Sequence, residues 1–248
     1  MLRATSTLTA LRQRITARVI DILASYRLLC ERGEALTKLL LPDTLKLLPA
    51  YASALLSTHA LTRAPTPPDA RAAAYVAIIT SPVYELIANL YPLLVRLDDP
   101  ASSHVALRLS RRALSSSGVY AFLSPARAWI YVGATVAPPT MAALFGSADP
   151  HSLAAATDFP LLDNDFSAHA HASFALLRSD IEARSGRAPH FRIVPAGSVH
   201  EPALLDLCIE DQAVANNSHS SLSYTDYMRL VHTGITKRVK AELAKPRK

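Results

Sequence analysis

Apolar residues recur every three or four positions near the N-terminus, with polar and charged residues mostly between them. The apolar positions are Leu8, Leu11, Ile15, Val19, Ile22, Leu23 and Tyr26. This spacing places their side chains on one face of a helix, and it predicts an amphipathic helix over Ser6–Glu31. Gly33 is expected to close that helix, because glycine readily adopts the left-handed conformation of a helix end.

The stretch Leu39–Ser57 is so apolar that it needs other helices to cover it. It contains Pro42, which suits the first turn of a helix, and Pro49, which removes an internal hydrogen bond and clashes with the preceding turn. We therefore expect a short helix over Asp43–Leu48, a kink or break at Pro49, and a second helix over Ala50–Leu61.

Proline-rich and turn-rich segments divide the chain after this stretch. Ala64–Pro68 is a predicted loop, and helices are predicted over Ala70–Ile79 and Pro82–Tyr91. Four or five helices with short links favour a helical bundle. The polar segment Leu97–Ser103 then marks the expected boundary between a helical domain, residues 1–99, and a second domain, residues 104–248.

The apolar segment Ala72–Val95 is long enough to span a bilayer. It contains Pro82, Glu85, Asn89 and Pro92, and a charged residue near the centre of a span costs a few kcal/mol. We therefore expect two packed helices and no transmembrane span.

The pattern changes after the boundary. Two β-branched and aromatic runs around a Ser-Pro turn, Gly118–Leu123 and Ala128–Val132, predict a β-hairpin. Two further strands are predicted over Phe191–Val194 and Leu204–Ile209. Helices are predicted over Pro138–Phe145, Ser167–Ala183 and, with Ser223 as its cap, Tyr224–Leu243. The expected fold class is α+β: an all-α helical bundle followed by a mixed sheet flanked by helices.

Two segments of the helical half carry a family signature. Ile22–Arg27 ends in a Tyr-Arg pair, and it precedes the run Leu41-Pro-Asp-Thr-Leu-Lys-Leu-Leu-Pro-Ala-Tyr51. These residues resemble the signature of the cargo-adaptor subunit of the COPII vesicle coat, the Sec twenty-four family. So many matching residue types in one short run are far more specific than a lone glycine motif.

The second half resembles the gelsolin-like domain of the same family. The matching segments are Gly118–Leu123, Trp129–Gly133, Leu161–Asn164 with Ser167, Ile209–Asp211, and Ser223–Tyr227 with His232. The resemblance implies a gelsolin-like domain over residues 104–248. The family's zinc finger, trunk and β-barrel have no counterpart in this sequence, so the resemblance is to the carboxyl-terminal portion only.

The chain is basic, with 26 lysine and arginine residues against 20 acidic ones and a formal net charge of +6. Much of the excess lies at the carboxyl end, at Lys237, Arg238, Lys240, Lys245, Arg247 and Lys248. Such a cluster is typical of a solvated terminal helix, and these residues are also the expected contact with an anionic membrane. Nucleic acid is not expected as a partner, because no aromatic residues interleave with a basic face.

Candidate chemical groups are few. His169 and His171 are two residues apart, so on a helix they point in different directions and do not share one metal ion. The acidic residues Asp206, Glu210 and Asp211 offer too few oxygens for calcium.

Cys30 and Cys208 are far apart and predict inert core thiols. The sequence has no nucleophile elbow, phosphate loop or dinucleotide fingerprint. We expect no catalytic residues, no metal, no cofactor and no enzymatic activity.

By resemblance, the chain is expected to be a non-catalytic, cargo-adaptor-like component of the COPII coat in vesicle-mediated protein transport from the endoplasmic reticulum to the Golgi. The implied partners are COPII coat proteins and cargo. The implied location is cytoplasmic, peripheral on the endoplasmic reticulum membrane and COPII vesicles. The alternative is a gelsolin-type actin- or calcium-binding module with a helical appendage.

Overall fold

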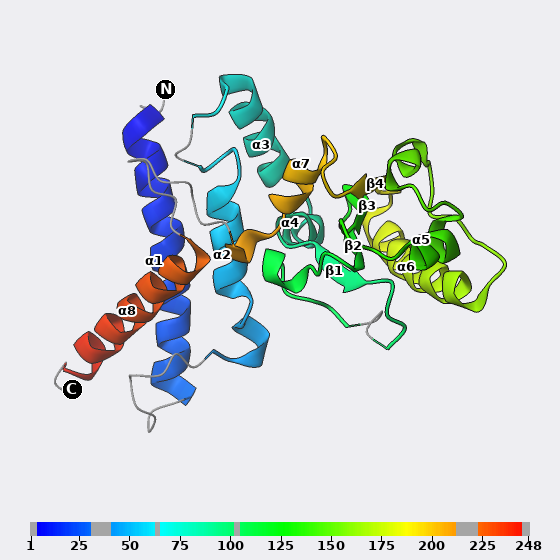
Figure 1. The fold of residues 1–248 in the computed structure, drawn as a ribbon. Coiled ribbons are helices and arrows are strands. Elements are labelled where there is room, and N and C mark those ends of the chain that lie inside the picture. The colour runs from blue at the N-terminus through cyan, green and yellow to red at the C-terminus, as the bar shows by residue number, and fades with distance from the viewer. Residues whose placement is uncertain (1–3, 31–40, 63–64, 102–104, 212–222, 245–248) are drawn as a thin grey trace. The chain divides into compact units, whose positions relative to one another are not determined.

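The computed structural model describes residues 4–30, 41–62, 65–101, 105–211 and 223–244 (Figure 1). Its contacts divide the chain into two compact units. Unit 1 comprises Met1–Thr80 with Gln212–Lys248, and unit 2 comprises Ser81–Asp211. The expected α+β fold class is confirmed, because helices precede a mixed four-stranded sheet that has helices of its own. Gly33, part of the predicted loop at Ala64, and Lys245, Arg247 and Lys248 lie outside the described residues.

Unit 1 is helical. Its described elements are α1 Ala4–Cys30, the 3-10 turn η1 Asp43–Leu45, α2 Leu48–Ser57, α3 Pro68–Thr80 and α8 Tyr224–Leu243. Helices α1, α2 and α8 pack against one another around a shared apolar core. The buried members of this core are Val19, Leu23, Ala24, Ala52, Leu56, Tyr227, Val231, Ile235 and Val239. The predicted apolar face of α1 is only partly buried: Val19 and Leu23 lie in this core, whereas Leu11 and Ile22 are exposed.

Two arginines tie the end of α2 to its neighbours. The Nη1 of Arg12 on α1 donates to the carbonyl oxygens of Leu56 and Leu61, each at 2.5 Å. From α3, the Nη1 of Arg71 donates to the carbonyls of Ala60 and Thr62, at 3.2 and 3.1 Å. Leu56 lies in the last turn of α2, where carbonyls have no partner within the helix, and Ala60, Leu61 and Thr62 lie in the turn that follows. The two guanidinium groups therefore bond carbonyls at and just after the end of α2.

The predicted kink or break between two helical segments is present, but it lies at Lys46 and Leu47, before Pro49. The expected helix over Asp43–Leu48 is a short 3-10 turn, and Pro49 lies in the first turn of α2, where its missing N–H costs no hydrogen bond. Helix α2 also ends earlier than expected, at Ser57, where the hydroxyl of Thr58 donates to the carbonyl of Leu55 at 2.7 Å.

Unit 2 contains the sheet. Its strands are β1 Leu93–Arg96, β2 Val119–Leu123, β3 Arg127–Val132 and β4 His190–Pro195, in the order β1-β2-β3-β4. The pairs β1-β2 and β2-β3 are antiparallel, and the pair β3-β4 is parallel. The predicted hairpin is β2-β3, closed by hydrogen bonds between Ser124 and Arg127.

Helices cover both faces of this sheet. In Figure 1, α5 Pro138–Phe145 and α6 Asp165–Ser185 lie on one side, and α4 Val83–Leu90 and α7 Glu201–Leu205 lie on the other. The short 3-10 elements are η2 Arg111–Ala113, η3 Pro150–Ala155 and η4 Ile209–Asp211. All five residues of β2 are buried, as expected for a central strand between two layers of helix.

Two elements of unit 2 differ from the sequence predictions. Strand β1 was not predicted, because it follows Pro92 directly and is only four residues long. The predicted strand Leu204–Ile209 is wrong. Its residues lie in the end of α7, a turn, and the start of η4, since Pro202 starts a helix readily and none of the four described strands pairs with them.

The compact units do not coincide with the predicted sequence domains. The final helix α8 packs on α1, although the prediction assigned it to residues 104–248. The predicted division into domains of residues 1–99 and 104–248 therefore stays a prediction. No helix among the described residues is long and apolar enough to cross a membrane.

We expect Gly133→Ala to destabilise unit 2. A Cβ atom at this position would lie 2.2 Å from the backbone carbonyl oxygen of Ser116, which itself accepts a hydrogen bond from the Thr135 N–H. Relieving such a clash needs a backbone shift that costs about 2–3 kcal/mol. Trp129, the only tryptophan, lies on β3, so its fluorescence during urea unfolding reports the loss. Ala134, the exposed residue next to Gly133, provides the control, and Ala134→Ser should leave the urea midpoint of unfolding unchanged. If Gly133→Ala also has the wild-type urea midpoint, the close packing of Gly133 against Ser116 is contradicted.

Candidate functional site

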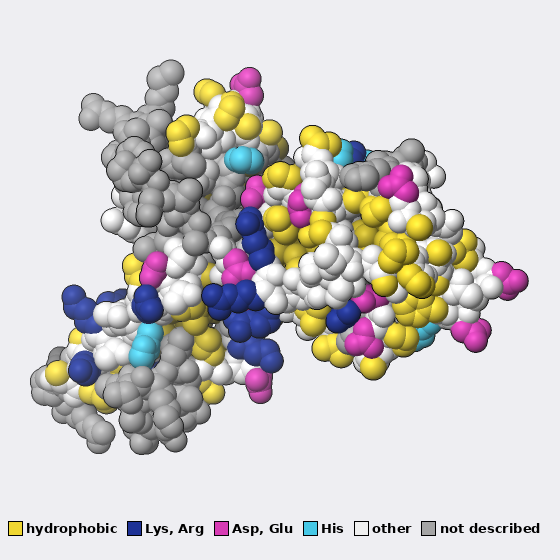
Figure 2. Space-filling view, in the orientation of Figure 1, with side chains coloured by type: hydrophobic (Ala, Val, Ile, Leu, Met, Phe, Trp, Pro, Cys, Tyr) yellow, Lys and Arg dark blue, Asp and Glu magenta, His cyan; other side chains and the backbone are white. Residues whose placement is uncertain are grey.

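The basic residues singled out from the sequence lie partly on α8. Ser223 caps this helix by accepting a hydrogen bond from the Asp226 N–H at 3.1 Å, which confirms the predicted start. The buried line of Tyr227, Val231, Ile235 and Val239 sets the rotation of α8, and it leaves Lys237, Arg238 and Lys240 exposed. Figure 2 shows dark-blue side chains over this helix.

Two arginines on α1 extend this basic region. The Nη2 of Arg238 lies 2.7 Å from the carboxylate of Asp21 on α1, in a pair with side chains 61% and 37% exposed. Arg18 precedes Asp21 by three residues and Arg14 by seven, which places both on the same side of the helix. Both are exposed. We call the set Arg14, Arg18, Lys237, Arg238 and Lys240 the α1/α8 basic surface.

The sequence prediction missed the contribution of α1. The spacing of Arg14 and Arg18 marks one polar helix face, but only the tertiary packing shows that this face adjoins α8. An exposed ion pair such as Arg238–Asp21 stabilises by at most about 1 kcal/mol. The Asp21 carboxylate therefore offsets one positive charge of the surface without removing its net positive character.

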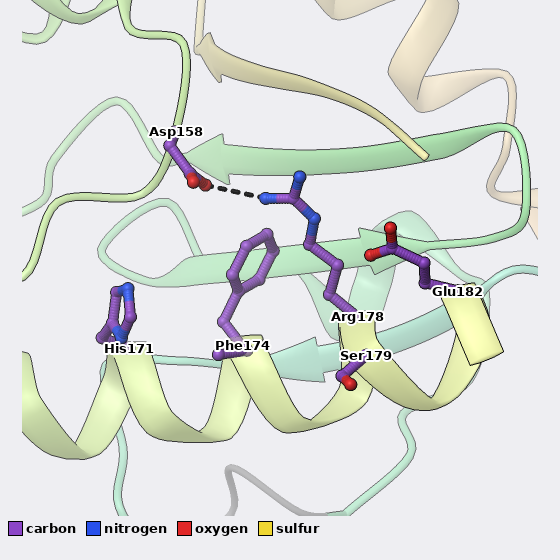
Figure 3. A pocket seen from close by; sticks show the side chains of 7 residues that line it. Asp158, His171, Phe174, Arg178, Ser179 and Glu182 are labelled. Carbon is purple, nitrogen blue, oxygen red and sulfur yellow. Dashed lines mark hydrogen bonds and ion pairs between the residues drawn. The ribbon is translucent and has the colours of Figure 1, made fainter. Parts of the chain in front are cut away.

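A shallow depression of about 220 Å³ lies along α6 in unit 2. Figure 3 shows its side chains, which come from α6 except for Asp158 and are Asp158, His171, Phe174, Ala175, Arg178, Ser179 and Glu182. The Nη1 of Arg178 donates to Asp158 at 2.8 Å above the buried ring of Phe174. The imidazole of His171 stacks on Phe159 with a ring separation of 6.1 Å.

This depression lacks the geometry of a nucleophilic site. His171 and Ser179 are eight residues apart on one helix, about 12 Å along its axis, so the imidazole is far from hydrogen-bond reach of the hydroxyl. His169 and His171 both lie on α6, as predicted. No group of three or more His, Cys, Asp or Glu side chains in the described part of the chain is arranged to hold a metal ion.

The acidic residues near α7 take part in internal bonds. Glu210 accepts from the hydroxyl of Tyr91 at 2.7 Å and pairs with Arg108 at 2.6 Å. Asp211 accepts from the Ser110 hydroxyl at 2.5 Å. Although partial burial raises the pKa of Asp211, that bond and backbone N–H donors outweigh it and hold the pKa below its ordinary value. These carboxylates therefore hold loops of unit 2 together.

Comparison with known proteins relates this chain to one family. Residues 1–88 match the family model described as the Sec23/Sec24 helical domain. The chain is 26% identical over 232 residues to human protein transport protein Sec24C, a match that spans 91% of this chain and 20% of Sec24C. It is 28% identical over 156 residues to protein transport protein SEC24 of Dictyostelium discoideum, covering 57% of this chain and 15% of that protein.

A solved structure supports the fold. A crystal structure of the human COPII-coat protein Sec24C superposes with a TM-score of 0.73 at 24% identity, covering 94% of this chain and 30% of that one. The resemblance predicted from the sequence motifs is confirmed by the sequence comparisons. They give no support to the alternative of an actin- or calcium-binding gelsolin module. The chain spans about a fifth or less of these two curated relatives.

We expect the Cys208 thiol to be inert in the folded protein. Burial raises its pKa to about 12, so at pH 8 the thiol is neutral and shielded from reagents. Because the thiol ionises more readily in the unfolded chain, the free energy of unfolding falls as the pH rises above about 9. Alkylation at pH 8 with peptide mapping should label Cys208 only after denaturant is added. Labelling of the native protein at a comparable rate would contradict this setting.

Proposed function

Because this chain is similar to the Sec24 family through both of its units, we propose that it is a cargo-adaptor-like component of the COPII coat. It would act in vesicle-mediated transport from the endoplasmic reticulum to the Golgi, with coat proteins and cargo as partners. The observation that carries the proposal is the match to Sec24C along 91% of the chain. The fold supports it, since the structural relative is itself a COPII-coat protein.

We further propose that the chain acts without catalysis, on the cytoplasmic side of the endoplasmic reticulum and its vesicles. The internal bonding of Glu210 and Asp211 and the separation of His171 from Ser179 are in keeping with a protein that works through its surfaces.

The α1/α8 basic surface is the proposed contact with anionic membrane, together with Lys245, Arg247 and Lys248. Each basic group near an anionic surface contributes about 1 kcal/mol, and salt screens the attraction. Five exposed cations from two helices therefore suffice for weak peripheral binding. Neutral membranes offer no such attraction.

The proposed function predicts where the chain accumulates. A fluorescently tagged full chain expressed in cells should concentrate at sites on the endoplasmic reticulum that also carry COPII coat markers. The destabilised variant Gly133→Ala controls for folding, because it should reduce accumulation only in step with its loss of folded protein. Uniform distribution of the well-folded wild type, or its enrichment on actin filaments, would contradict the coat assignment.

The membrane proposal predicts salt-sensitive flotation. The full chain should float with vesicles of phosphatidylserine and phosphatidylcholine, and remain at the bottom with phosphatidylcholine alone. Lys237→Gln with Lys240→Gln should weaken binding by about thirtyfold at low salt, since two contributions of about 1 kcal/mol are removed.

A matched pair in unit 2 serves as the control for total charge. Arg184→Gln with Arg187→Gln removes the same charge from side chains that are 59% and 56% exposed. If both pairs weaken flotation equally, the attraction is to net charge and not to this surface. That result would remove the assigned role from α8 while leaving the coat assignment intact.

A further inference from the structure

Two arginines of unit 2 lie beside the only tryptophan of the chain, on one face of the sheet. Arg127 and Trp129 are two residues apart on β3, so their side chains leave the strand on the same side. The guanidinium carbon of Arg127 lies 5.5 Å from the centre of the Trp129 ring. Arg192 of β4 is the register partner of Trp129 and shares that face. The opposite face is the core side, where Ile130 and Ile193 are buried.

Two histidines extend this group. His190 lies opposite Arg127 in the register of β3 and β4, and it is exposed. The Nη1 of Arg192 donates to the Nε2 of His200, in the turn before α7, because an arginine side chain carries donors only. With Nε2 as the acceptor, the ring of His200 carries its hydrogen on Nδ1 and is a further donor. We call Arg127, His190, Arg192 and His200 the β3/β4 basic cluster.

Neither arginine of the cluster has an acidic partner among the described residues. The same sheet face offers a comparison in Arg96 of β1, which also lies near an aromatic ring but bonds both carboxylate oxygens of Asp98, at 2.9 and 2.8 Å. Burial lowers the pKa of the Arg127 guanidinium, as expected for a cation that is partly desolvated without a nearby carboxylate. The indole N–H of Trp129 is also buried, with no acceptor in the described part of the chain.

The carboxylates on the two helices of this sheet face, α4 and α7, are bonded elsewhere. Glu201 on α7 accepts from the hydroxyl of Tyr131 at 3.0 Å and from the Gly197 N–H at 2.7 Å. Glu85 on α4 pairs with Arg187 at 2.6 Å. Donors therefore outnumber acceptors around the cluster, and the partner that this place lacks is a group that accepts hydrogen bonds and carries negative charge.

Phosphate matches this set of donors. Arg127 and Arg192 occupy diagonal positions on adjacent strands, about 8 Å apart, so their long side chains can meet on one ligand. One planar guanidinium satisfies a carboxylate, whereas the three terminal oxygens of a phosphate monoester accept from several donors at once. The monoester carries a charge of about −1.5 to −2, which balances two arginines. We propose that the β3/β4 basic cluster binds a phosphoryl group carried by a peptide.

The surroundings favour a peptide over a membrane. The cluster lies on the sheet face that α4 and α7 also occupy (Figure 1): Asn89 of α4 accepts from the Ala126 N–H at the hairpin, and α7 contacts β3 and β4. Because a helix is about 10 Å thick, a flat bilayer meets these helices before it meets the sheet. Val199, 85% exposed beside His200, offers an apolar contact to a side chain that flanks the phosphorylated residue.

The fluorescence of Trp129 reports binding at this site, because no other tryptophan contributes to the emission of the full chain. The probes are the capped tripeptide acetyl-leucyl-phosphoseryl-leucine amide, the same peptide without phosphate, and inorganic phosphate, all at one ionic strength. The phosphorylated tripeptide should change the emission saturably. It should bind at least about threefold more tightly than inorganic phosphate, because its leucines bury apolar surface against Val199. The unphosphorylated tripeptide should have no effect.

Variants distinguish this site from the net charge of the chain. Arg192→Gln should weaken binding of the phosphorylated tripeptide by at least about tenfold, since charge-assisted hydrogen bonds are lost. Arg192→Lys keeps the charge but lacks the planar pair of donors, and it should weaken binding by at least about threefold. The matched control is Arg229→Gln, which removes the same charge from a side chain 75% exposed on α8 and should leave the affinity unchanged. Thermal melts establish that each variant is folded.

The proposal is overturned if the phosphorylated tripeptide leaves the Trp129 emission unchanged through the millimolar range. Equal weakening by Arg192→Gln and Arg229→Gln would assign the attraction to net charge and would also overturn it. Vesicles of phosphatidylcholine with phosphatidylinositol phosphate serve as the lipid arm. If they change the emission at a lower phosphate concentration than the tripeptide does, the occupant is a lipid headgroup and the peptide assignment is wrong. The coat proposal rests on sequence similarity and survives each of these results.

Discussion

The hydrogen bonds of Arg12 to the end of α2 are the interaction on which the helical unit depends. One guanidinium on α1 satisfies the carbonyls of Leu56 and Leu61, and Arg71 satisfies two more in the same turn. These bonds add to the cap that Thr58 provides, since its hydroxyl donates to the Leu55 carbonyl. With α2 held against α1, the two helices present the apolar groove that α8 fills with Tyr227 and Val231.

Polar groups in unit 2 serve the same structural purpose. The carboxylates of Glu210 and Asp211 join the chain after α7 to Arg108, Ser110 and Tyr91. A buried or half-buried carboxylate that is fully hydrogen-bonded stabilises a loop, and it has few free oxygens left to bind a cation. Glu210 and Asp211 are therefore explained by the loops that they join.

The sequence predicted best those elements that local rules control. The hairpin of β2 and β3, helix α5 with Gly146 in the left-handed conformation at its end, and the Ser223 cap of α8 all follow from residues within a few positions of each other. Local rules failed for Leu204–Ile209, because an apolar run of this length suits a strand or a helix equally. They failed for β1 because four residues are too few to show the periodic pattern that identifies a strand.

The motif residues, the α+β class and the family resemblance were therefore available from the sequence by itself, since each depends on residue types at short spacing. The pairing of α8 with α1 was decided only by tertiary structure, because the contact of Gly234 with Ile20 and the ion pair of Arg238 with Asp21 join residues more than 200 positions apart. The same packing decided which side chains stay exposed. Arg14 and Arg18 became part of the basic surface because α8 packs beside α1, a contact that no local pattern contains.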